Sequence, residues 1–355
     1  MLHKFEVILP QKNYPIIIKK SILKDIGNEI KKVYNNKRIT IITDENVEKI
    51  YGEKLTDNLE AYGFEVNLIS IVPGENSKTI QVLTHIYNEL IDNRITRKDL
   101  IIAFGGGVVG DLAGFAASTF LRGIRYIQIP TSLLAQIDSS IGGKVAVNLP
   151  RGKNLVGNFY HPEAVYIDSD LLKTLPKKFL NDGMGEVIKY SCIKDRELFN
   201  RLKGITNESD LFLIINEIIL KCCNIKKEFV EKDEKEAGDR MLLNFGHTIG
   251  HAIEKAFNYE EYTHGEAVSI GMYCITRKSE SLGMTVKGTS DLLKELLVKF
   301  ELPYQYPKID RDIFLEAINL DKKSESDSIN LILLNEIGNS FVKRIKKEDI
   351  TQYLL

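Results

Sequence analysis

The chain has 355 residues, a length that predicts two domains because single domains usually have about 100–200 residues. Apolar residues make up 43% and charged residues 27%, which excludes a wholly disordered chain and leaves ample material for a core. The 48 Lys and Arg residues nearly balance the 49 Asp and Glu residues, so the formal net charge of −1 argues against nucleic acid or an anionic membrane as a partner. Any recognition of anions must therefore come from local clusters of basic side chains.

The N-terminus and the cysteines favour a cytoplasmic protein. The first six residues alternate polar and apolar types and lack the basic start and apolar run of a signal peptide. No uncharged apolar stretch reaches the ~18–20 residues of a membrane-spanning helix. The four cysteines show no CxxC spacing, so we expect buried thiols in a reducing compartment: Cys192, Cys222, Cys223 and Cys274.

Strand-like and helix-like segments alternate through the first half of the chain. Continuous apolar, β-branched runs predict strands at 38–43, 63–72, 99–104, 126–129 and 164–167. Between them, residues 78–91 place Ile80, Leu83 and Ile86 on one helical face. Apolar strands separated by helices predict a parallel sheet that is covered on both faces. We therefore expect an α/β Rossmann-like nucleotide-binding domain at 1–172.

Helical periodicity dominates from Phe179 onward. The clearest helices are predicted at 210–230, 242–257, 265–281 and 290–300, and only 329–334 is predicted as a strand. No internal repeat or low-complexity tract is visible. The second predicted domain, at 173–355, is therefore mainly α-helical.

The strongest motif of the first half is GGGVVGD at 105–111, which follows a predicted strand and opens a predicted helix. Glycines let the backbone approach a pyrophosphate, and a helix N-terminus offers unpaired N–H groups. A tight turn without a ligand is the alternative, and the spacing is not the usual GxGxxG, so the cofactor is weakly specified. Asp44 could accept hydrogen bonds from a ribose, although an N-cap is the more common role of such a residue. The segment 73–78 by itself predicts only a turn that leads into a helix.

The most informative motif of the second half is a group of histidines. His247 and His251 are four residues apart, on one helical face, and His264 follows closely. Upstream, Glu186 is a carboxylate on a largely apolar helix, where it needs a partner or a metal ion. Two histidines and one glutamate leave an open coordination position, the pattern of catalytic zinc. Spacing alone does not choose among the histidines, and the simplest pairing joins His247 with His251.

Basic residues are concentrated beside these motifs. Although most lysines are simply solvated, those next to glycine turns and to the metal-binding helix are candidates for binding a phosphorylated anion. They are Lys144, Arg151, Lys153, Lys189, Lys226, Arg240, Lys322 and Lys323, with Asn154 beside them.

At these motifs the chain resembles the 3-dehydroquinate synthase family. The matching segments occur in the family's order and cover most of residues 38–282: GGGVVGDLAGFAASTFLRG (105–123), PTSLLAQIDSSIGGKVAVN (130–148), GKNLVGNFYHP (152–162), GEVIKY (185–190), LLNFGHTIGHAIE (242–254) and HGEAVSIGM (264–272). The resemblance implies a Rossmann-like domain followed by a helical domain, and a homodimer.

The resemblance also implies a reaction of the shikimate pathway, which leads to aromatic amino acids. The substrate is the phosphorylated sugar acid 3-deoxy-D-arabino-heptulosonate 7-phosphate, and the products are 3-dehydroquinate and phosphate. NAD takes a hydride and later returns it, so the enzyme is a lyase without net redox change. Phosphate elimination, reduction and an intramolecular aldol closure follow the oxidation, and a divalent ion, zinc or cobalt, is required.

The family's site residues map onto this chain by motif. The implied metal ligands are Glu186, His247 and His264, which replaces the simple histidine pairing and leaves His251 near the substrate. The implied cofactor residues are Asp44, Glu75, Lys78, Gly107, Val108, Val109, Gly110, Asp111, Thr131, Ser132, Lys144, Lys153, Leu171, Leu172, Lys173 and Thr174. The implied catalytic and substrate residues are Arg122 (from the partner subunit), Asp138, Lys144, Asn154, Lys189, Lys226, Arg240, Asn244, His251 and Lys322.

Two departures and three alternatives accompany the resemblance. Ser132 stands where the family commonly has a second threonine, and 324–330 lacks the glycine and arginine often found before the last strand. Another sugar phosphate cyclase, such as a valiolone or deoxy-inosose synthase, would share the cofactor and metal motifs. A metal-dependent polyol dehydrogenase would share the layout but produce NADH. A non-catalytic nucleotide-binding protein would not need three metal ligands.

Overall fold

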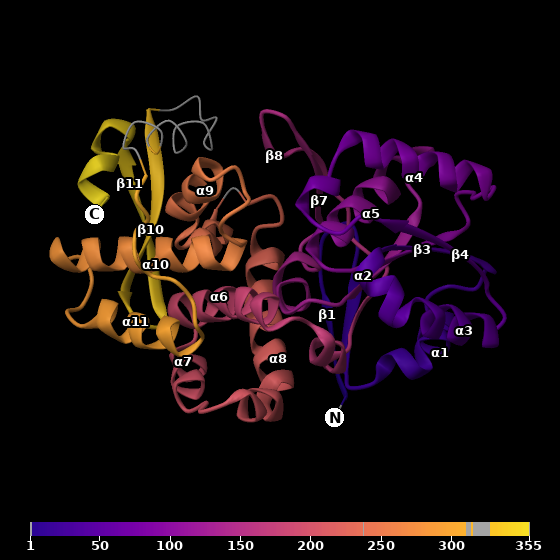
Figure 1. The fold of residues 1–355 in the computed structure, drawn as a ribbon, viewed down its shortest axis with the longest axis horizontal. Coiled ribbons are helices and arrows are strands. Elements are labelled where there is room, and N and C mark those ends of the chain that lie inside the picture. Colours follow the sequence, from indigo (N-terminus) through magenta and orange to yellow (C-terminus); the bar gives the residue numbers. More distant parts are fainter. Residues whose placement is uncertain (1, 237, 310–313, 315–326, 355) are drawn as a thin grey trace. The chain divides into compact units, whose positions relative to one another are not determined.

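The computed structural model describes residues 2–236, 238–309, 314 and 327–354, and it divides into two compact units (Figure 1). The first unit contains 1–175 and 226–235, and the second contains 176–225 and 236–355. The long helix α8 (Glu208–Lys232) therefore contributes residues to both units. Among the described residues, no helix has the length and apolar character needed to cross a membrane.

The first unit is built on a seven-stranded sheet with the order β1-β2-β9-β6-β5-β3-β4. Only the pair β1–β2 is antiparallel, and the other neighbours are parallel. The strands of the sheet are β1 (Leu2–Val7), β2 (Tyr14–Lys19), β3 (Arg38–Asp44), β4 (Glu65–Ile71), β5 (Leu100–Gly105), β6 (Arg125–Pro130) and β9 (Val165–Ile167). The five strands predicted from apolar runs are β3, β4, β5, β6 and β9.

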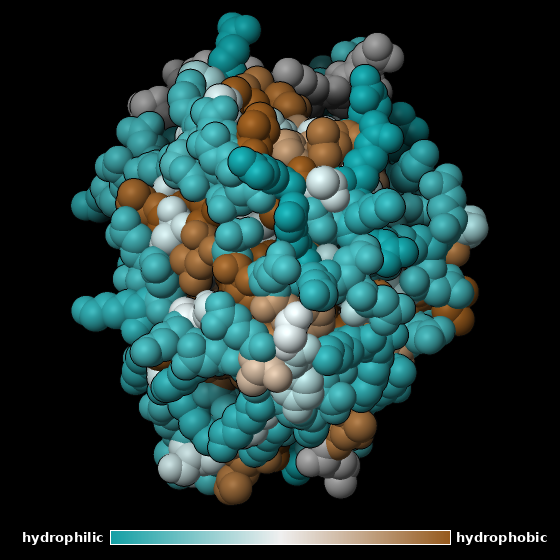
Figure 2. Space-filling view, turned by 90° about the vertical axis from the view of Figure 1, so that its right-hand side faces the viewer, coloured by the Kyte–Doolittle hydropathy of each residue, from teal (hydrophilic) through white to brown (hydrophobic). Residues whose placement is uncertain are grey.

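Both faces of this sheet are covered, as continuous apolar strands require. Along β5, Ile101 and Ala103 pack into the core cluster that includes α4 (Ile80–Asp92) and α5 (Gly107–Thr119). Leu100, Ile102 and Phe104 point to the opposite cluster, with α1 (Ile26–Lys31) and α3 (Glu53–Ala61). Viewed from the side of α3, α4 and β4, the surface is mostly hydrophilic, and its hydrophobic residues form separate groups (Figure 2). The α/β Rossmann-like architecture predicted from the sequence is confirmed.

The first unit also contains shorter elements. A short helix, α2 (Glu45–Val47), follows β3, and an antiparallel hairpin is formed by β7 (Lys144–Leu149) and β8 (Gly152–Phe159). A 3₁₀ helix at Ser169–Thr174 precedes the second unit. The pair β1–β2 and the hairpin β7–β8 were not predicted from the sequence.

The second unit is mainly helical, as predicted. Its helices besides α8 are α6 (Lys177–Ile193), α7 (Arg196–Lys203), α9 (His247–Ala256), α10 (His264–Ser281) and α11 (Thr289–Lys299). Helix α10 is largely buried and packs against α6, α9 and α11. An antiparallel pair, β10 (Ser328–Glu336) and β11 (Asn339–Lys346), packs beside these helices.

Two sequence predictions for this unit were wrong in detail. The predicted helix 242–257 begins only at His247, because its N-cap Gly246 adopts φ 80° in the left-handed region and separates α9 from a 3₁₀ helix at Asp239–Asn244. A Cβ on Gly246 would lie 2.7 Å from the carbonyl oxygen of Val268, so this position requires glycine. The prediction of a single strand missed β11, the partner of β10.

Candidate active site

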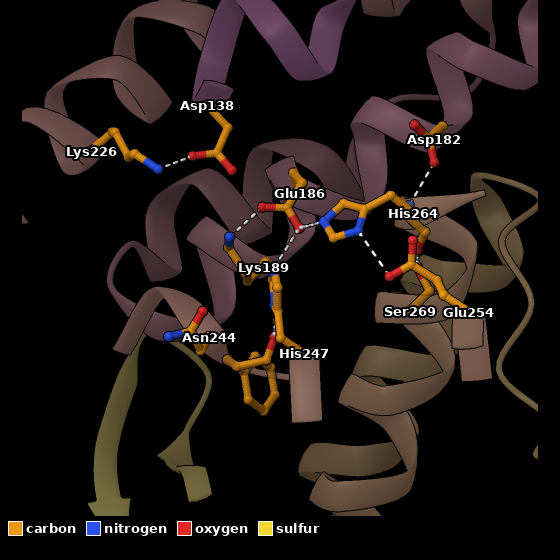
Figure 3. Close-up of polar contacts among 12 residues, drawn as sticks. Asp138, Asp182, Glu186, Lys189, Lys226, Asn244, His247, Glu254, His264 and Ser269 are labelled. Atoms are coloured by element: carbon orange, nitrogen blue, oxygen red, sulfur yellow. Dashed lines mark hydrogen bonds and ion pairs between the residues drawn. The ribbon is translucent and has the colours of Figure 1, made fainter. Parts of the chain in front are cut away.

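Glu186, His247 and His264 lie together in the second unit, where they form a candidate metal centre (Figure 3). Their ligand atoms all lie within 4.8 Å of one another. Glu186 Oε1 lies 3.7 Å from Nε2 of His247 and 3.7 Å from Nε2 of His264. A carboxylate oxygen and two imidazole nitrogens that converge in this way form the donor set that zinc prefers. These residues therefore fit a divalent ion, with a coordination position left open.

Close helix packing brings the three side chains together. Glu186 is on α6, His247 opens α9, and His264 opens α10. Gly185 of α6 and Gly265 of α10 face each other, and a Cβ on Gly185 would lie 2.8 Å from the carbonyl oxygen of Gly265. Only a pair of glycines permits this approach, which places His264 beside Glu186.

Asp182 fixes the first turn of α10. It lies one helical turn before Glu186 on α6, and its Oδ1 accepts a hydrogen bond of 2.6 Å from the backbone N–H of Gly265. At the same helix end, Thr263 and Glu266 form a capping box. The position of His264 is therefore set by a side chain of α6 and by capping within α10.

Opposite pKa shifts distinguish the two histidines of the group. Burial, together with the positive charge of Lys189, lowers the pKa of His247 well below its usual value. Burial also lowers the pKa of His264, but the carboxylates of Glu254 and Glu186 outweigh this effect and raise that pKa to about 9. The lowered pKa of His247 favours the neutral imidazole, the form in which a histidine binds a metal ion.

Lys189 is fully buried beside the metal group and forms an ion pair with Glu186 Oε2, one helical turn away. The carboxylate thus has one oxygen toward the lysine and the other toward the two imidazoles. Arg240 is also buried, with 1% of its surface exposed, and Nδ2 of Asn244 donates to Glu236 at 2.8 Å. Lys189 and Arg240 are thus the buried lysine and arginine among the described residues of the second unit, and burying each charge costs hydration free energy.

His251 lies one turn after His247 on α9, with its ring centroid 5.3 Å from that of His247 and 6.0 Å from that of His264. A second group of possible ligands contains His251, Glu254 and His264. Among the described residues, neither group of possible ligands includes both His247 and His251. The two histidines of the simple i, i+4 pairing, His247 and His251, therefore lie in different groups of possible ligands.

The glycine motif of the first unit forms the turn expected from the sequence. β5 ends at Gly105, and α5 begins at Gly107, with Gly106 as its N-cap. A Cβ on Gly107 would lie 3.2 Å from Oγ of Ser139. The first N–H groups of α5 have no partner within the helix, and because Gly106 and Gly107 lack side chains, a ligand can approach this backbone closely.

Lys78 is the charged centre beside this turn. It is 4% exposed, forms an ion pair with Asp111 of α5 and donates a hydrogen bond to Oδ1 of Asn154. Burial lowers the pKa of Lys78, but Asp111 and Glu75 outweigh it and raise that pKa. Glu75 in turn accepts a hydrogen bond of 2.7 Å from Asn148. Several of the predicted cofactor residues thus form one polar network.

The other residues predicted for the cofactor lie in the same unit as this polar network. Asp44 caps α2, since its Oδ1 accepts from the N–H groups of Asn46 and Val47 at 3.0 and 3.1 Å. Thr174 exchanges a hydrogen bond of 2.8 Å with Tyr51. The remaining residues are buried or half-buried in the same unit, apart from the exposed Lys144 and Lys173: Val108, Val109, Gly110, Thr131, Ser132, Lys153, Leu171 and Leu172.

The residues predicted to bind substrate are divided between the units. Asp138 forms an ion pair with Lys226 in the first unit, which also contains Lys144, Asn154 and Arg122. Arg122 is exposed and has φ 68°, next to Leu121 with φ 51°. Lys189, Arg240, Asn244 and His251 belong to the second unit. Lys322 lies outside the described residues.

Sequence reasoning missed Asp182 and Glu254, two buried carboxylates beside the metal group. Asp182 has one available signal, its position four residues before Glu186. Glu254 lies seven residues, or two helical turns, after His247. Neither spacing alone distinguishes them from other acidic residues of a helix.

Comparison with known proteins assigns the family. The model of the N-terminal domain of 3-dehydroquinate synthase matches residues 68–182, and the model of the C-terminal domain matches 183–324. A 3-dehydroquinate synthase of Clostridium acetobutylicum is 55% identical over 349 residues, 98% of each chain. That of Enterococcus faecalis is 44% identical over 351 residues, 99% of this chain and 98% of the relative.

Solved structures share the fold of this chain over nearly its whole length. A 2-deoxy-scyllo-inosose synthase complexed with carbaglucose-6-phosphate, NAD⁺ and Co²⁺ is 26% identical and has a TM-score of 0.87, with 99% of this chain and 100% of that chain covered. A 2-epi-5-epi-valiolone synthase of Streptomyces hygroscopicus, with NAD⁺ and Zn²⁺ bound, is 25% identical with the same TM-score, covering 98% and 97%. Two domain models together match residues 68–324, relatives at 44–55% identity cover nearly the whole chain, and the chain therefore belongs to the 3-dehydroquinate synthase family.

Proposed function

We propose that this chain converts 3-deoxy-D-arabino-heptulosonate 7-phosphate to 3-dehydroquinate and phosphate, using NAD and a divalent metal ion. The grouping of Glu186, His247 and His264 carries the proposal, because a protein that only bound a nucleotide would not need it. The identity of 44–57% to curated 3-dehydroquinate synthases supports this activity over that of the cyclases at 25–26% identity. The reaction belongs to the shikimate pathway.

Glu186, His247 and His264 would hold the metal ion, zinc or cobalt. When bound, such an ion lowers the pKa of a substrate hydroxyl and polarises a carbonyl. Nδ1 of His247 donates to the carbonyl oxygen of Phe245 at 3.1 Å, which leaves Nε2 as the atom directed toward Glu186. Lys189 compensates the charge of the Glu186 carboxylate.

The start of α5 would hold the NAD pyrophosphate. The N–H groups at Gly107, Val108 and Val109 lie at a helix start, where partial positive charge favours an anion. Lys78 and Asp111 lie beside the turn, and Asp44 is the last residue of β3, which pairs with β5. NAD supplies the transient hydride acceptor of the reaction.

The charged residues predicted for the substrate suit an anion with a carboxylate and a phosphate. Lys189 and Arg240 are buried cations, and lysine and arginine are the residue types that bind carboxylates and phosphates. Asn244 and His251 add hydrogen-bonding groups from the same unit. Lys226, Lys144 and Asn154 would act from the first unit, and the role assigned to Lys322 by resemblance stays a prediction.

A cytoplasmic homodimer completes the proposal. Arg122 would contribute to the site of the partner subunit, which agrees with its exposure and with the exposed Leu121 beside it. The exposed Leu149, Leu155 and Phe159 of the β7–β8 hairpin are apolar side chains suited to an interface. Light scattering checks the mass of the assembly.

One assay tests the activity. The purified protein, loaded with zinc and supplied with catalytic NAD, should release phosphate from the heptulosonate phosphate without accumulating NADH. Removal of the metal with EDTA should abolish the release, and zinc or cobalt should restore it. Accumulation of one NADH per substrate would instead indicate a polyol dehydrogenase, and turnover only of a sugar phosphate that lacks the carboxylate would indicate another cyclase.

A further inference from the structure

Glu254 is a buried carboxylate that the proposed reaction does not use directly. It lies on α9, two turns after His247, and is 3% exposed. Its Oε2 lies 3.5 Å from Nδ1 of His264 (Figure 3). A carboxylate in such a place requires a partner that offsets its desolvation. The imidazole of His264 is a partner that the structure identifies.

The two nitrogens of His264 face two different carboxylates. Nε2 lies 3.7 Å from Glu186 Oε1, on the side of the metal group, and Nδ1 faces Glu254. A histidine that binds a metal through one nitrogen commonly donates its other N–H to a carboxylate or a carbonyl. That second hydrogen bond fixes the tautomer and the ring orientation.

We propose that Glu254 is a positioning residue that accepts a hydrogen bond from Nδ1–H of His264 and directs Nε2 toward the metal ion. The inference rests on the proposed metal site and deepens it. The two histidine ligands are then oriented by different means, since Nδ1 of His247 faces the backbone carbonyl of Phe245 at 3.1 Å. Glu254 adds a negative charge behind one ligand, which raises the basicity of that imidazole.

Direct ligation by Glu254 is the competing arrangement, because Glu254, His251 and His264 also form a possible group of ligands. Two observations favour positioning. Glu186 is completely buried, and its Oε1 faces both Nε2 atoms, so an ion in that group compensates its charge. If the ion were instead bound by Glu254 and Nδ1 of His264, it would not offset the charge of Glu186. Among the cations seen beside Glu186 in the described residues, Lys189 alone would then do so.

Metal affinity tests the role of Glu254 independently of turnover. Zinc binding to the full-length apoprotein is measured by competition with a chromophoric chelator. We expect Glu254→Ala to weaken zinc binding by about 10–100-fold, the usual effect of removing such a partner. Glu254→Gln should weaken zinc binding less than Glu254→Ala does, because the amide oxygen of glutamine still accepts a hydrogen bond from Nδ1–H of His264. Glu260→Gln is the matched control, because Glu260 is an exposed carboxylate just after α9 and belongs to neither group of possible ligands, so it should bind zinc within about twofold of wild type.

The visible spectrum of bound Co²⁺ separates positioning from ligation. The Co²⁺ bands of Glu254→Gln should keep the position and intensity of the wild type, because the three ligands are unchanged. A changed coordination spectrum, or affinity equal to wild type in both Glu254 variants, would overturn the proposal. Wild-type protein that binds no zinc at all would refute the proposed function as well, so the two failures are distinguishable.

A measurement on wild type covers the case in which neither variant folds. In zinc-loaded protein, long-range ¹H–¹⁵N correlations of the His264 ring identify the protonated nitrogen. We expect a proton on Nδ1 and the metal on Nε2. A proton on Nε2 would overturn the assignment without any substitution.

Discussion

Replacement of Gly265 by alanine tests how helix packing builds the metal group. A Cβ at this position would lie 2.8 Å from the carbonyl carbon of Asp182 and 3.0 Å from its Cα, and it would overlap the carbonyl oxygen. These atoms belong to backbone, so no side chain can move aside. Helix α10 would have to move away from α6, taking His264 with it.

The displacement can be estimated from these distances. Ordinary contact begins at about 3.4 Å, so the helices must separate by at least about 0.6 Å to relieve the contact with the carbonyl carbon alone. Ligand distances in metal sites are held to about ±0.2 Å. The separation therefore exceeds this tolerance about threefold at His264, which moves with α10.

We expect Gly265→Ala to lower the free energy of unfolding by about 1–3 kcal/mol, the usual effect of overpacking. Zinc affinity should fall at least about tenfold, because a site displaced by more than about 0.5 Å loses its preorganisation. Thermal unfolding of the apoprotein measures the first effect, and chelator competition measures the second.

Gly52→Ala is the control. Gly52 is a helical glycine of the first unit, and its nearest neighbour at 3.1 Å is Cγ of Glu48, a flexible side chain. This variant should keep its zinc affinity and change stability by less than about 1 kcal/mol. If Gly265→Ala matched wild type in both measurements, the glycine contact would not be what sets the position of His264.

Two further predictions concern buried charges and thiols. Lys78→Met leaves the carboxylate of Asp111 without its lysine partner and should lower the free energy of unfolding by about 3–5 kcal/mol. The double variant Lys78→Met with Asp111→Asn should recover part of this loss. Denaturant titrations of the double-mutant cycle measure the coupling, and additive effects of the two substitutions would contradict it. Burial raises the pKa of Cys192 to about 12, and it raises the pKa of Cys274 to about 12 although the charge of Arg277 lowers it. At pH 8, therefore, only about one such thiol in ten thousand is a thiolate. Ellman's reagent should therefore modify these two cysteines only after unfolding, and rapid labelling of either in folded protein, mapped by mass spectrometry, would contradict their burial.

The predictable part of the fold is the part with strong local patterns. The run 99–104 is continuously apolar and ends in glycines, and it forms β5 and the start of α5. In contrast, β1 and β11 mix polar with apolar residues and lack a continuous apolar run, and their partners cannot be seen in a single sequence. The helix predicted at 242–257 starts late because Gly246 has a positive φ, and this glycine lies against α10, which is remote from it in sequence.

The site follows the same division. The residue types predicted a metal group, because acidic and imidazole side chains in apolar helices need partners. Spacing, however, favoured His247 with His251, since it detects only neighbours within one helix. The proximity of His264 to Glu186 depends on Gly185, Gly265 and Asp182, which join α6 to α10. Only the family resemblance pointed to His264 before the structure was known.

Anomalous scattering at the zinc absorption edge, from crystals of the zinc-loaded protein, tests the proposed metal centre most directly. We expect one peak within about 2.0–2.2 Å of a carboxylate oxygen of Glu186 and of Nε2 of both His247 and His264. A peak coordinated by Glu254 and His251, or the absence of a peak from protein saturated with zinc, would contradict the account.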